Sequence, residues 1–406
     1  MTVIRYYQNY HKHSWFTNIK VSDSVASYED YAKRAVELGH KLISSCEHGW
    51  QGRYIECFEL AQQHGLKFLE ASEAYWVKDR FEKDRSNCHI FLGAKNERGR
   101  RALNSALAEA NITGFYGQPR LDIPLLLSLP GDDIWVTTAC IAYWRYDDID
   151  DITKRFRDHF GKNFFLEVQY HNEDKQRRIN EHVLELSLKE KIPIIMGCDS
   201  HYILPVGGAD RSDYIASKGM DYPDESGFIL DYPDGDTAYC RFADQGVLGG
   251  SEIDEAMRNT NIFLEVEDYD CPCFTKDIKM PTLFPGLTQE ERNAKYDAVI
   301  WSAWDREKQS IPVEQHAHYE QEIRLETDIV HTTKHADYFL DDHAIVKRGI
   351  ELGGVLTSTG RGSAVSFYTN KLLGLTEVDR IAAKVKMYPE RFMSPTRILE
   401  AKTLAD

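Results

Sequence analysis

The sequence lacks a positive net charge, a long apolar run and a secretory signal pattern. Its 406 residues include 49 Lys and Arg against 65 Asp and Glu, a formal net charge of −16. This argues against a protein that holds nucleic acid mainly by bulk positive charge. No apolar run approaches the roughly 20 residues needed to span a bilayer, which excludes an obvious transmembrane helix. We find no internal repeat and no low-complexity tract.

The composition of the chain is that of a globular protein. Hydrophobic residues make up 42% of the chain and charged residues 28%, which excludes disordered, collagen-like and disulfide-stapled classes. The length suffices for one large domain and part of a second, or for two ordinary domains. Charge is unevenly distributed: between Ile345 and Lys402 there are ten basic and five acidic residues. The C-terminal end is therefore locally basic on an acidic protein.

The cysteines do not indicate a disulfide framework, because several of the eight lie inside apolar runs. A reducing cytoplasm is the expected compartment. The Cys271-Pro272-Cys273 pair lacks the second cysteine pair of a zinc site, and we assign it no function.

Short apolar runs alternate with helical patterns up to about Tyr202, which is typical of βα units that build a parallel sheet or barrel. The clearest helices are expected at Ser27–Leu38, with a capping pair Ser27 and Asp30, and at Glu173–Lys191. The seven expected strands are Ile4–Asn9, Leu42–Cys46, Phe68–Trp76, Cys88–Gly93, Ile134–Cys140, Phe164–Gln169 and Pro193–Cys198.

The chain changes character after the seventh strand. Residues Gly207–Gly250 have no sustained period and predict a long loop or an inserted excursion, followed by a helix at Glu252–Arg258 and a strand at Ile262–Val266. Turn residues at Pro281, Pro285 and Gly286 then mark a domain boundary. Beyond the boundary, helices are expected at Glu290–Glu307, Glu314–His331 and Tyr338–Leu352, before a glycine-rich turn at Gly360–Ser363.

The strongest chemical signal is a series of histidines, carboxylates and one cysteine at the ends of different expected strands. In a parallel barrel those ends converge on one face, so these residues would share one site. They are the ligand types of zinc, or of manganese where oxygen dominates. Two ions about 4 Å apart can activate water and steady a leaving oxygen, which suits phosphoester hydrolysis. The candidates are His11, His13, Glu47, His48, Glu73, His89, Cys140, Asp199 and His201.

The order HxH, (D/E)H, E-A-Y, a strand histidine, a strand cysteine and a terminal D-x-H resembles a known domain. This is the PHP (polymerase and histidinol phosphatase) domain of the bacterial DNA polymerase III alpha family. The resemblance implies an α/β fold, a distorted (β/α)7 barrel over residues 1–273. It also implies up to three zinc or manganese ions and, where every ligand is kept, a metal-dependent 3′–5′ exonuclease.

Carried over by motif, the resemblance implies three ion sites. His11, His13, Glu73 and Asp199 would hold one ion, and Glu73 would be shared with a second ion held by His89 and Cys140. His48 and His201 would hold the third. Two positions depart from the family: Glu47 stands where Asp is usual, and Asp23, the candidate carboxylate for the third ion, comes about three residues late. His171 either lines the site or is an ordinary loop histidine.

Gly360-Arg361-Gly362-Ser363 is a weaker signal that gains meaning from its surroundings. Glycine, arginine and a hydroxyl before a helix can bind phosphate. The run Tyr338–Thr376 resembles the palm of the same polymerase family, where a G-R-G-S-A turn grips the nucleotide triphosphate. The later "YPERFMSPTRI" resembles an E-R-F-x-x-P-x-R segment. The resemblance therefore implies nucleotide contacts from Arg361, Gly362, Ser363 and Arg391, in an incomplete α+β palm segment over residues 274–406.

In that family a D-x-D motif follows and, with a third carboxylate, holds the two magnesium ions of nucleotidyl transfer. Asp406 stands about where the first of these catalytic carboxylates is expected. One aspartate cannot hold two magnesium ions, so we expect a truncated polypeptide or the product of a split gene that needs the remaining polymerase segment. The implied partners are primer-template DNA, a deoxynucleoside triphosphate and other replisome subunits, with no membrane.

Three functions therefore remain open. The first is the N-terminal part of a replicative DNA polymerase with a PHP exonuclease. The second is a stand-alone PHP phosphoesterase or pyrophosphatase, against which the palm-like third of the chain argues. The third is a metal-stabilised scaffold without catalysis, against which the nearly complete ligand set argues.

Overall fold

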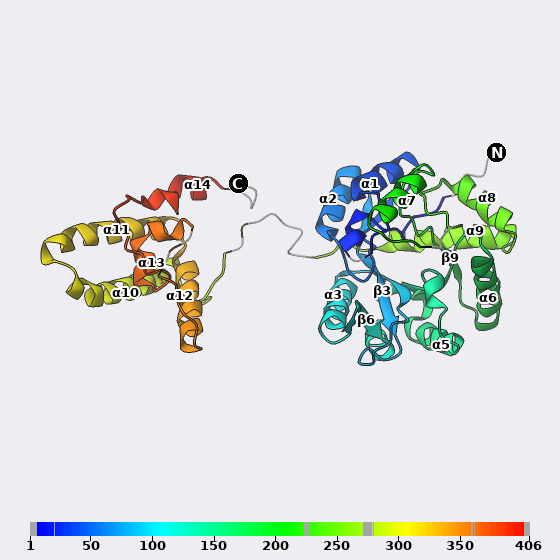
Figure 1. Cartoon of the computed structure of the whole chain (residues 1–406), viewed down its shortest axis with the longest axis horizontal. Helices are drawn as coiled ribbons and strands as arrows, with labels where there is room; N and C mark the ends of the chain where they lie inside the picture. The colour runs from blue at the N-terminus through cyan, green and yellow to red at the C-terminus, as the bar shows by residue number, and fades with distance from the viewer. Residues whose placement is uncertain are drawn as a thin grey trace. The chain divides into compact units, whose positions relative to one another are not determined.

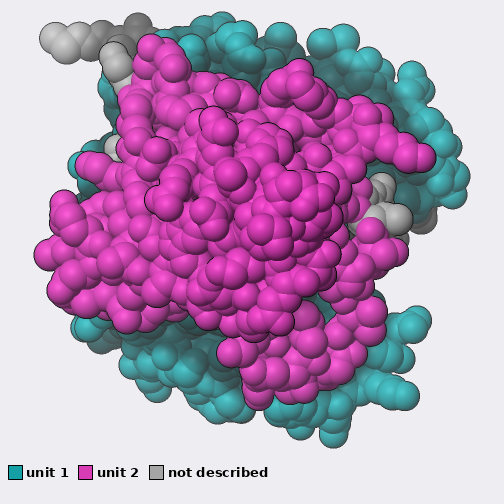
Figure 2. Space-filling view, turned by 90° about the vertical axis from the view of Figure 1, so that its left-hand side faces the viewer, with its two compact units in different colours: residues 1–274 teal, residues 275–406 magenta. Residues whose placement is uncertain are grey.

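The computed structural model describes residues 6–19, 21–222, 227–270, 278, 280–358, 360 and 362–401. The chain divides into two compact units, residues 1–274 and residues 275–406, which Figure 2 colours separately. Cys271 and Cys273 lie outside the described residues. None of the described helices combines the length and apolar character needed to span a bilayer.

The strands of the first unit are short and form one large sheet and one small parallel pair (Figure 1). The order in the large sheet is β5-β6-β3-β4-β7-β8-β9, and β1 pairs with β2. Of the strand expected at Ile4–Asn9, the described residues 6–9 have no strand assignment. The strands are β1 (Leu42–Ser44), β2 (Lys67–Leu69), β3 (Ala71–Val77), β4 (Cys88–Ala94), β5 (Phe115–Tyr116), β6 (Gln118–Asp122), β7 (Ile134–Thr137), β8 (Phe164–Val168) and β9 (Ile194–Met196).

Isolated bridges join these pieces. Lys12 pairs with Ser200 beyond the end of β9, and His48 pairs with Glu73 in β3. The Lys12 ammonium also donates to the carbonyl oxygen of Ser44 at the end of β1, at 2.8 Å. The N-terminal segment thus bridges the last strand to the first, which links the two sheets into a barrel-like ring.

The inner face of this ring is defined by one apolar cluster that takes a residue from nearly every strand. Because side chains alternate in a strand, residues next to these face outward, into a second and larger apolar cluster under the helices. The α/β fold expected from the sequence is confirmed. The inner cluster includes Leu42, Leu69, Ala71, Phe91, Trp135, Phe165 and Ile195, together with Tyr10 and Phe263.

The expectation of an all-parallel arrangement is wrong. Strand β4 runs antiparallel to both of its neighbours, β3 and β7. The reason lies in the connection, because residues 78–87 between β3 and β4 contain no helix. A connection without a crossover helix returns the chain antiparallel. The single strand expected at Phe68–Trp76 is divided into β2 and β3 at Glu70, and β5 and β6 were not expected.

Helices surround the strands in the first unit (Figure 1). The helices expected at Ser27–Leu38, Glu173–Lys191 and Glu252–Arg258 are confirmed as α1, α6 and α9. They are α1 (Tyr28–Glu37), α2 (Tyr54–His64), α3 (Glu97–Ile112), α4 (Ile123–Leu126), α5 (Ile149–Phe160), α6 (Asp174–Glu190), α7 (Gly207–Ser217), α8 (Gly235–Gln245) and α9 (Gly250–Asn259), with 3₁₀ segments η1 (Trp15–Ile19), η2 (Ile141–Tyr143), η3 (Gly161–Asn163) and η5 (Thr260–Glu265).

Two further stretches of this unit differ from the sequence expectation. Residues Gly207–Gly250 are not one long loop, because they contain α7 and α8. Asp234 caps α8 by accepting from the Thr237 backbone N–H at 2.7 Å, a local signal that the glycine and proline content obscured. The strand expected at Ile262–Val266 is 3₁₀ segment η5 instead. Its Phe263 packs into the barrel against Tyr10 and Trp135.

The second unit, as far as it is described, is helical and contains no strand, so only the helical part of the expected α+β palm segment is seen. The three long helices expected from the sequence are confirmed, and they pack with a separate apolar cluster around Tyr296, Trp304 and Phe367. The elements are α10 (Gln289–Glu307), α11 (His316–Thr332), α12 (Ala336–Glu351), α13 (Tyr368–Leu372) and α14 (Pro395–Glu400), with 3₁₀ segments η7 (Lys308–Ser310), η8 (Val313–Gln315), η9 (Ala364–Ser366) and η10 (Pro389–Arg391).

Candidate metal centre

Glu73 lies at the middle of the candidate metal centre, with its side chain fully buried. It is two residues beyond the inward-facing Ala71 of β3, so strand alternation directs it to the same interior. One carboxylate oxygen lies 3.4 Å from Nε2 of His11 and 3.0 Å from Nδ1 of His89. The other lies 3.3 Å from Nε2 of His13 and 2.8 Å from Nδ1 of His48. Four imidazoles from three segments of the chain therefore meet at one carboxylate.

The reversed direction of β4 brings His89 into this group. His89 is at the start of β4, and it pairs with Tyr75 near the end of β3. In a strand parallel to β3 the same position would lie at the opposite end of the barrel. The thiol sulfur of Cys140 lies 3.2 Å from Nδ1 of His89, so these two side chains extend the group on one side.

Asp199 and Asp23 complete the group on the other sides. Asp199 Oδ1 is 3.1 Å from Nε2 of His13 and 3.5 Å from Nε2 of His11. Asp23 Oδ2 is 3.2 Å from Nε2 of His48 and 3.4 Å from Nε2 of His201. Asp23 thus lies between two histidines, although it comes about three residues later than the family spacing implies.

The backbone is strained at two of these positions. Asp199 has a φ of +46°, and Ala139, immediately before Cys140, has a φ of +47°. The left-handed region is tolerated by aspartate but is unfavourable for alanine. Strain of this kind persists where the surrounding structure imposes it, often at functional sites. At both positions it sets the direction of a side chain in the group.

The donor set fits divalent metal ions. His11 Nε2, both ring nitrogens of His13, His48 Nδ1, Glu73 Oε2 and Asp199 Oδ1 are buried and form no hydrogen bond with the described residues. Unsatisfied buried polar atoms are costly, and their convergence is what a bound cation would relieve. Three triads have ligand atoms within 4.8 Å of one another: His13, His48 and His201; His11, His13 and Glu73; and His48, Glu73 and His89.

Charge in the group is balanced internally. Burial opposes ionisation of Glu73, but the imidazoles of His89, His48 and His11 outweigh it and hold the pKa of this carboxyl well below its usual range. Burial likewise opposes protonation of His11, whereas Glu167, Asp199 and Glu73 raise its pKa well above the usual value. Metal binding requires neutral imidazoles, so it must release protons and weaken as the pH falls.

A buried glutamate that the sequence analysis did not select orients His11. Glu167 in β8 accepts hydrogen bonds from His11 Nδ1–H at 2.7 Å, Tyr10 O–H at 2.7 Å and Thr137 O–H at 2.6 Å. This directs Nε2 of His11 toward Glu73 and Asp199, the arrangement of a carboxylate–histidine–metal triad. Gly197 makes room for it, because a Cβ at that position would lie 1.7 Å from the Glu167 carboxylate. Glu167 lies within the strand expected at Phe164–Gln169. A carboxylate among the apolar residues of that strand was the sequence signal that could have identified it.

Glu47 is not part of the metal group, contrary to the sequence expectation. Its carboxylate accepts from the Tyr28 hydroxyl at 2.7 Å and from both the backbone N–H and the hydroxyl of Ser14. These contacts satisfy it, and burial raises its pKa to about 7. Neighbouring side chains of an extended segment face opposite ways, so His48 reaches the metal group and Glu47 does not.

His171 is buried and held in place by two contacts. Its Nδ1 accepts from the Ile229 backbone N–H at 3.1 Å, and its ring stacks on Phe228 at 4.5 Å between centroids. Burial lowers its pKa to about 4. His171 is therefore neutral at physiological pH and supports the wall of the site through Phe228.

The metal group opens into a cavity of about 450 Å³. Asp23, His48, His89, Cys140, Asp199 and His201 line its metal-ligating side. Aromatic rings of Tyr75 and Phe228 and the cations Arg145 and Lys175 also line it. An anionic ester bound here would meet both the cluster and positive charge.

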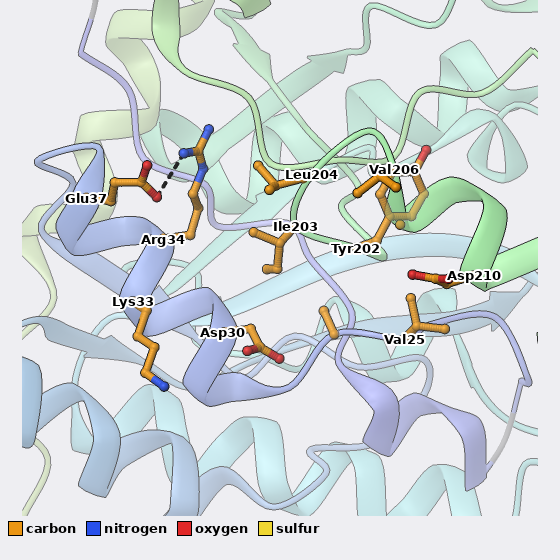
Figure 3. Close-up of a pocket in the computed structure, with 12 residues that line it drawn as sticks. Val25, Asp30, Lys33, Arg34, Glu37, Tyr202, Ile203, Leu204, Val206 and Asp210 are labelled. Carbon is orange, nitrogen blue, oxygen red and sulfur yellow. Dashed lines mark ion pairs between the residues drawn. The ribbon is translucent and has the colours of Figure 1, made fainter.

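A different hollow, of about 370 Å³, lies between α1 and the start of α7 (Figure 3). Its lining shares no residue with the metal cavity. Figure 3 shows Arg34 of α1 turned to Glu37, with which it forms an ion pair at 2.9 Å. The residues that line this hollow include none of the candidate metal ligands.

In the second unit, Arg361 and Asp406 lie outside the described residues. Gly362 has a φ of +77° and is exposed, and Ser363 directly precedes η9. A Cβ on Gly360 would lie 2.0 Å from the Val365 side chain, so the turn requires glycine there. Segment η10, which ends at the exposed Arg391, packs against η9. Phe392 contacts Phe367 at 5.1 Å between centroids, so the glycine turn and the Arg391 segment share one region.

Two family descriptions match the chain. Residues 9–171 match the PHP domain, and residues 297–401 match the bacterial DNA polymerase III alpha NTPase domain. Curated relatives named DNA polymerase III subunit alpha are 25% identical in Helicobacter pylori and in Aquifex aeolicus, in both cases over 94% of this chain and 34% of the relative. The chain thus spans about a third of the length of these relatives.

Two solved structures are also similar. One, described as a metal-dependent phosphoesterase from Bifidobacterium adolescentis, has a TM-score of 0.32 and 16% identity, covering 58% of this chain and 96% of its own. The other is a two-domain Bacteroides vulgatus protein containing a PHP-like metal-dependent phosphoesterase. It has a TM-score of 0.29 and 15% identity, covering 53% of this chain and 56% of its own.

Proposed function

Because this chain is related to the bacterial DNA polymerase III alpha subunits and carries their PHP domain, we propose that its first unit is a metal-dependent 3′–5′ exonuclease. The observation that carries the proposal is the set of unsatisfied buried polar atoms around Glu73, next to a 450 Å³ cavity that His48, Asp199 and other candidate ligands line. Bound divalent ions would supply an activated water and positive charge for a leaving oxygen.

The residues of the chain have distinct roles in this proposal. His11, His13, Glu73 and Asp199 would hold one ion. His89 and Cys140 would complete a second with Glu73, and His48, His201 and Asp23 would hold the third. Zinc or manganese suits this mixture of imidazole, carboxylate and thiolate. Glu167 keeps His11 in the orientation that leaves Nε2 free.

Residues 275–406 are, in the same proposal, the beginning of a polymerase palm in the cytoplasm. Gly362, Ser363 and Arg391 would contact the triphosphate of an incoming nucleotide. Primer-template DNA, the remaining polymerase segment with its magnesium site, and other replisome subunits are the proposed partners. The packing of η10 against η9 supports a shared nucleotide site in this region.

The test is release of nucleotides from the 3′ end of a labelled DNA primer by the 406-residue chain with Mn²⁺ or Zn²⁺. We expect the His11→Ala/His13→Ala double variant to lose at least a hundredfold in rate. His316 and His318 have the same His-x-His spacing outside the metal group, so His316→Ala/His318→Ala is the matched control. Equal rates for wild type and the His11/His13 variant would contradict the proposal.

Two further measurements separate the alternatives. Turnover of a small chromogenic phosphate without action on DNA would indicate a PHP phosphoesterase or pyrophosphatase. Bound metal that raises the melting temperature, with hydrolysis of neither substrate, would indicate a scaffold.

A further inference from the structure

A second cavity adjoins the metal cavity through a shared residue. Lys175 lines both the 450 Å³ metal cavity and a cavity of about 520 Å³ on α6. The second cavity is lined by Trp144, Asp174, Lys175, Arg178, Ile179 and His182. The two hollows therefore adjoin at Lys175, and the lining of the second lies mainly on α6; we call Arg145, Lys175, Arg178 and Trp144 the path.

Positive charge follows this path. Arg145 stands in the metal cavity, Lys175 at the junction and Arg178 in the second cavity, and all three side chains are exposed. None forms an ion pair with a carboxylate in the described part of the chain, although Arg145 donates to the Ser86 carbonyl oxygen at 2.8 Å. Asp174 is the sole carboxylate lining the second cavity. The second cavity thus carries Lys175 and Arg178 against one carboxylate, which favours an anion there on a protein of net charge −16.

An aromatic side chain stands beside these cations. Trp144 is half-buried and packs against the main core, with its ring 5.3 Å from His182 in an edge-to-face contact. His182 Nε2 contacts the Asp150 carboxylate at 2.8 Å. The imidazole that packs against the indole of Trp144 is therefore itself held in place. Cationic side chains interleaved with a rigid aromatic ring are the pattern by which proteins bind single-stranded nucleic acid.

The length of the path is suitable as well. Residues 175–182 of α6 extend over roughly 10 Å of helix axis, which equals about three stacked nucleotides of one strand. Lys175, Arg178, Ile179 and His182 are spaced by three or four residues and so share one helix face.

We propose that the Lys175–Arg178–Trp144 path binds the single strand of DNA behind its 3′-terminal nucleotide, with phosphates at the cations and a base against Trp144. The proposal rests on the proposed exonuclease function and adds the site that selects a polynucleotide over a small ester. Arg145 contacts the terminal phosphodiester in the metal cavity.

The first test measures binding without cleavage. Fluorescence anisotropy follows a labelled single-stranded DNA octanucleotide against the 406-residue chain, over a salt series. For Lys175→Gln/Arg178→Gln we expect about tenfold weaker binding and a salt slope smaller by roughly 0.7 per lost phosphate contact. Trp144→Leu should weaken binding severalfold with the slope unchanged, because stacking is not ionic. Lys189→Gln, an exposed lysine on the same helix outside both cavities, is the control.

The second test measures cleavage of di-, tri-, tetra- and octanucleotides with Mn²⁺. In the wild type, kcat/KM should rise up to about four nucleotides and then level off. In the Lys175/Arg178 variant this rise should be lost. The proposed path would be overturned if kcat/KM of the Lys175/Arg178 variant still rose with oligonucleotide length. It would also be overturned if that variant bound DNA as tightly as Lys189→Gln does. If the wild type binds DNA through these residues but releases no nucleotide, the exonuclease proposal fails and the path stands.

Discussion

Glu73 shows at the scale of one residue how a metal site is built from strand alternation. It contacts four imidazoles because it lies on the inner side of β3, two residues past Ala71. The same alternation places Glu167 two residues past the inward-facing Phe165 of β8. Residue types were readable from the sequence, but only the side-chain directions separate His48, which points to Glu73, from its neighbour Glu47, which points to Ser14 and Tyr28.

Replacing Glu167 by glutamine should weaken metal binding without unfolding the protein. Glutamine retains the size of the side chain, but its NH₂ group cannot accept from His11, Tyr10 and Thr137 as the carboxylate does. We expect a 10- to 100-fold loss of affinity for Zn²⁺ or Mn²⁺, measured by competition with a chelating dye. Glu185→Gln, on the exposed side of α6, should bind as the wild type does. Equal affinities in both variants would show that Glu167 does not position His11.

His40 should make the protein sensitive to mild acid. Burial, with a contribution from Arg34, lowers its pKa to about 4, and its ring contacts the Tyr232 hydroxyl at 2.7 Å. The unfolded chain takes up this proton near pH 6.5, so the stability is present above that pH and is lost as the pH falls toward 4. His40→Gln should flatten the fall in melting temperature between pH 6.5 and 4. The exposed His318→Gln should not, and identical slopes for all three proteins would refute the role.

At the scale of the element, local signals predicted helices well and strand direction poorly. Helix α1 begins at Tyr28 because Ser27 and Asp30 form a reciprocal capping box. The direction of β4 depends on the segment that joins it to β3. Residues 78–87 have neither a helical nor a strand pattern, so the sequence did not indicate that the chain turns back there. In α7 and α8 the weak apolar pattern hid helices that are stabilised by packing, such as the burial of Phe242.

The capping box of α1 can be tested directly. Ser27→Ala removes the acceptor for the Asp30 backbone N–H, which lies at 3.1 Å, and should lower the free energy of unfolding by about 1 kcal/mol. Urea denaturation provides the measurement. Lys33→Ala breaks an exposed pair with Glu29 on the same helix, and a change below about 0.5 kcal/mol is expected there. A larger effect from Lys33 than from Ser27 would contradict this account of where α1 begins.

At the scale of the whole molecule, the chain has two units with separate apolar clusters. The metal group belongs entirely to the first, where it concentrates buried carboxylates and imidazoles that a cation would satisfy. The second has its own buried charge, Glu326, which accepts from the backbone N–H groups of Tyr368 and Thr369 at the start of α13. Each unit thus has its own source of stability.

Metal removal should therefore affect one unfolding transition and not the other. Calorimetry of the metal-loaded chain is expected to show two transitions, and chelation should lower the one that belongs to residues 1–274. A ligand that binds only the folded state stabilises it by mass action, about 4 kcal/mol at a thousand times Kd. The His11→Ala/His13→Ala variant, already deprived of the site, should not respond to chelator. Equal shifts of both transitions would show that metal acts on the whole chain.

The sequence by itself determined the class of fold, and it predicted a division into two domains and the ligand types of the candidate site. Apolar periodicity and the types and order of the candidate ligands are properties of the sequence itself, so they can be read without a structure. Tertiary structure decided which candidates converge. It excluded Glu47, joined Asp23 to His48 and His201, and added Glu167 and the cationic path along α6. These depend on strand direction and on which side of the backbone a side chain leaves, and both are fixed only when distant segments pack together.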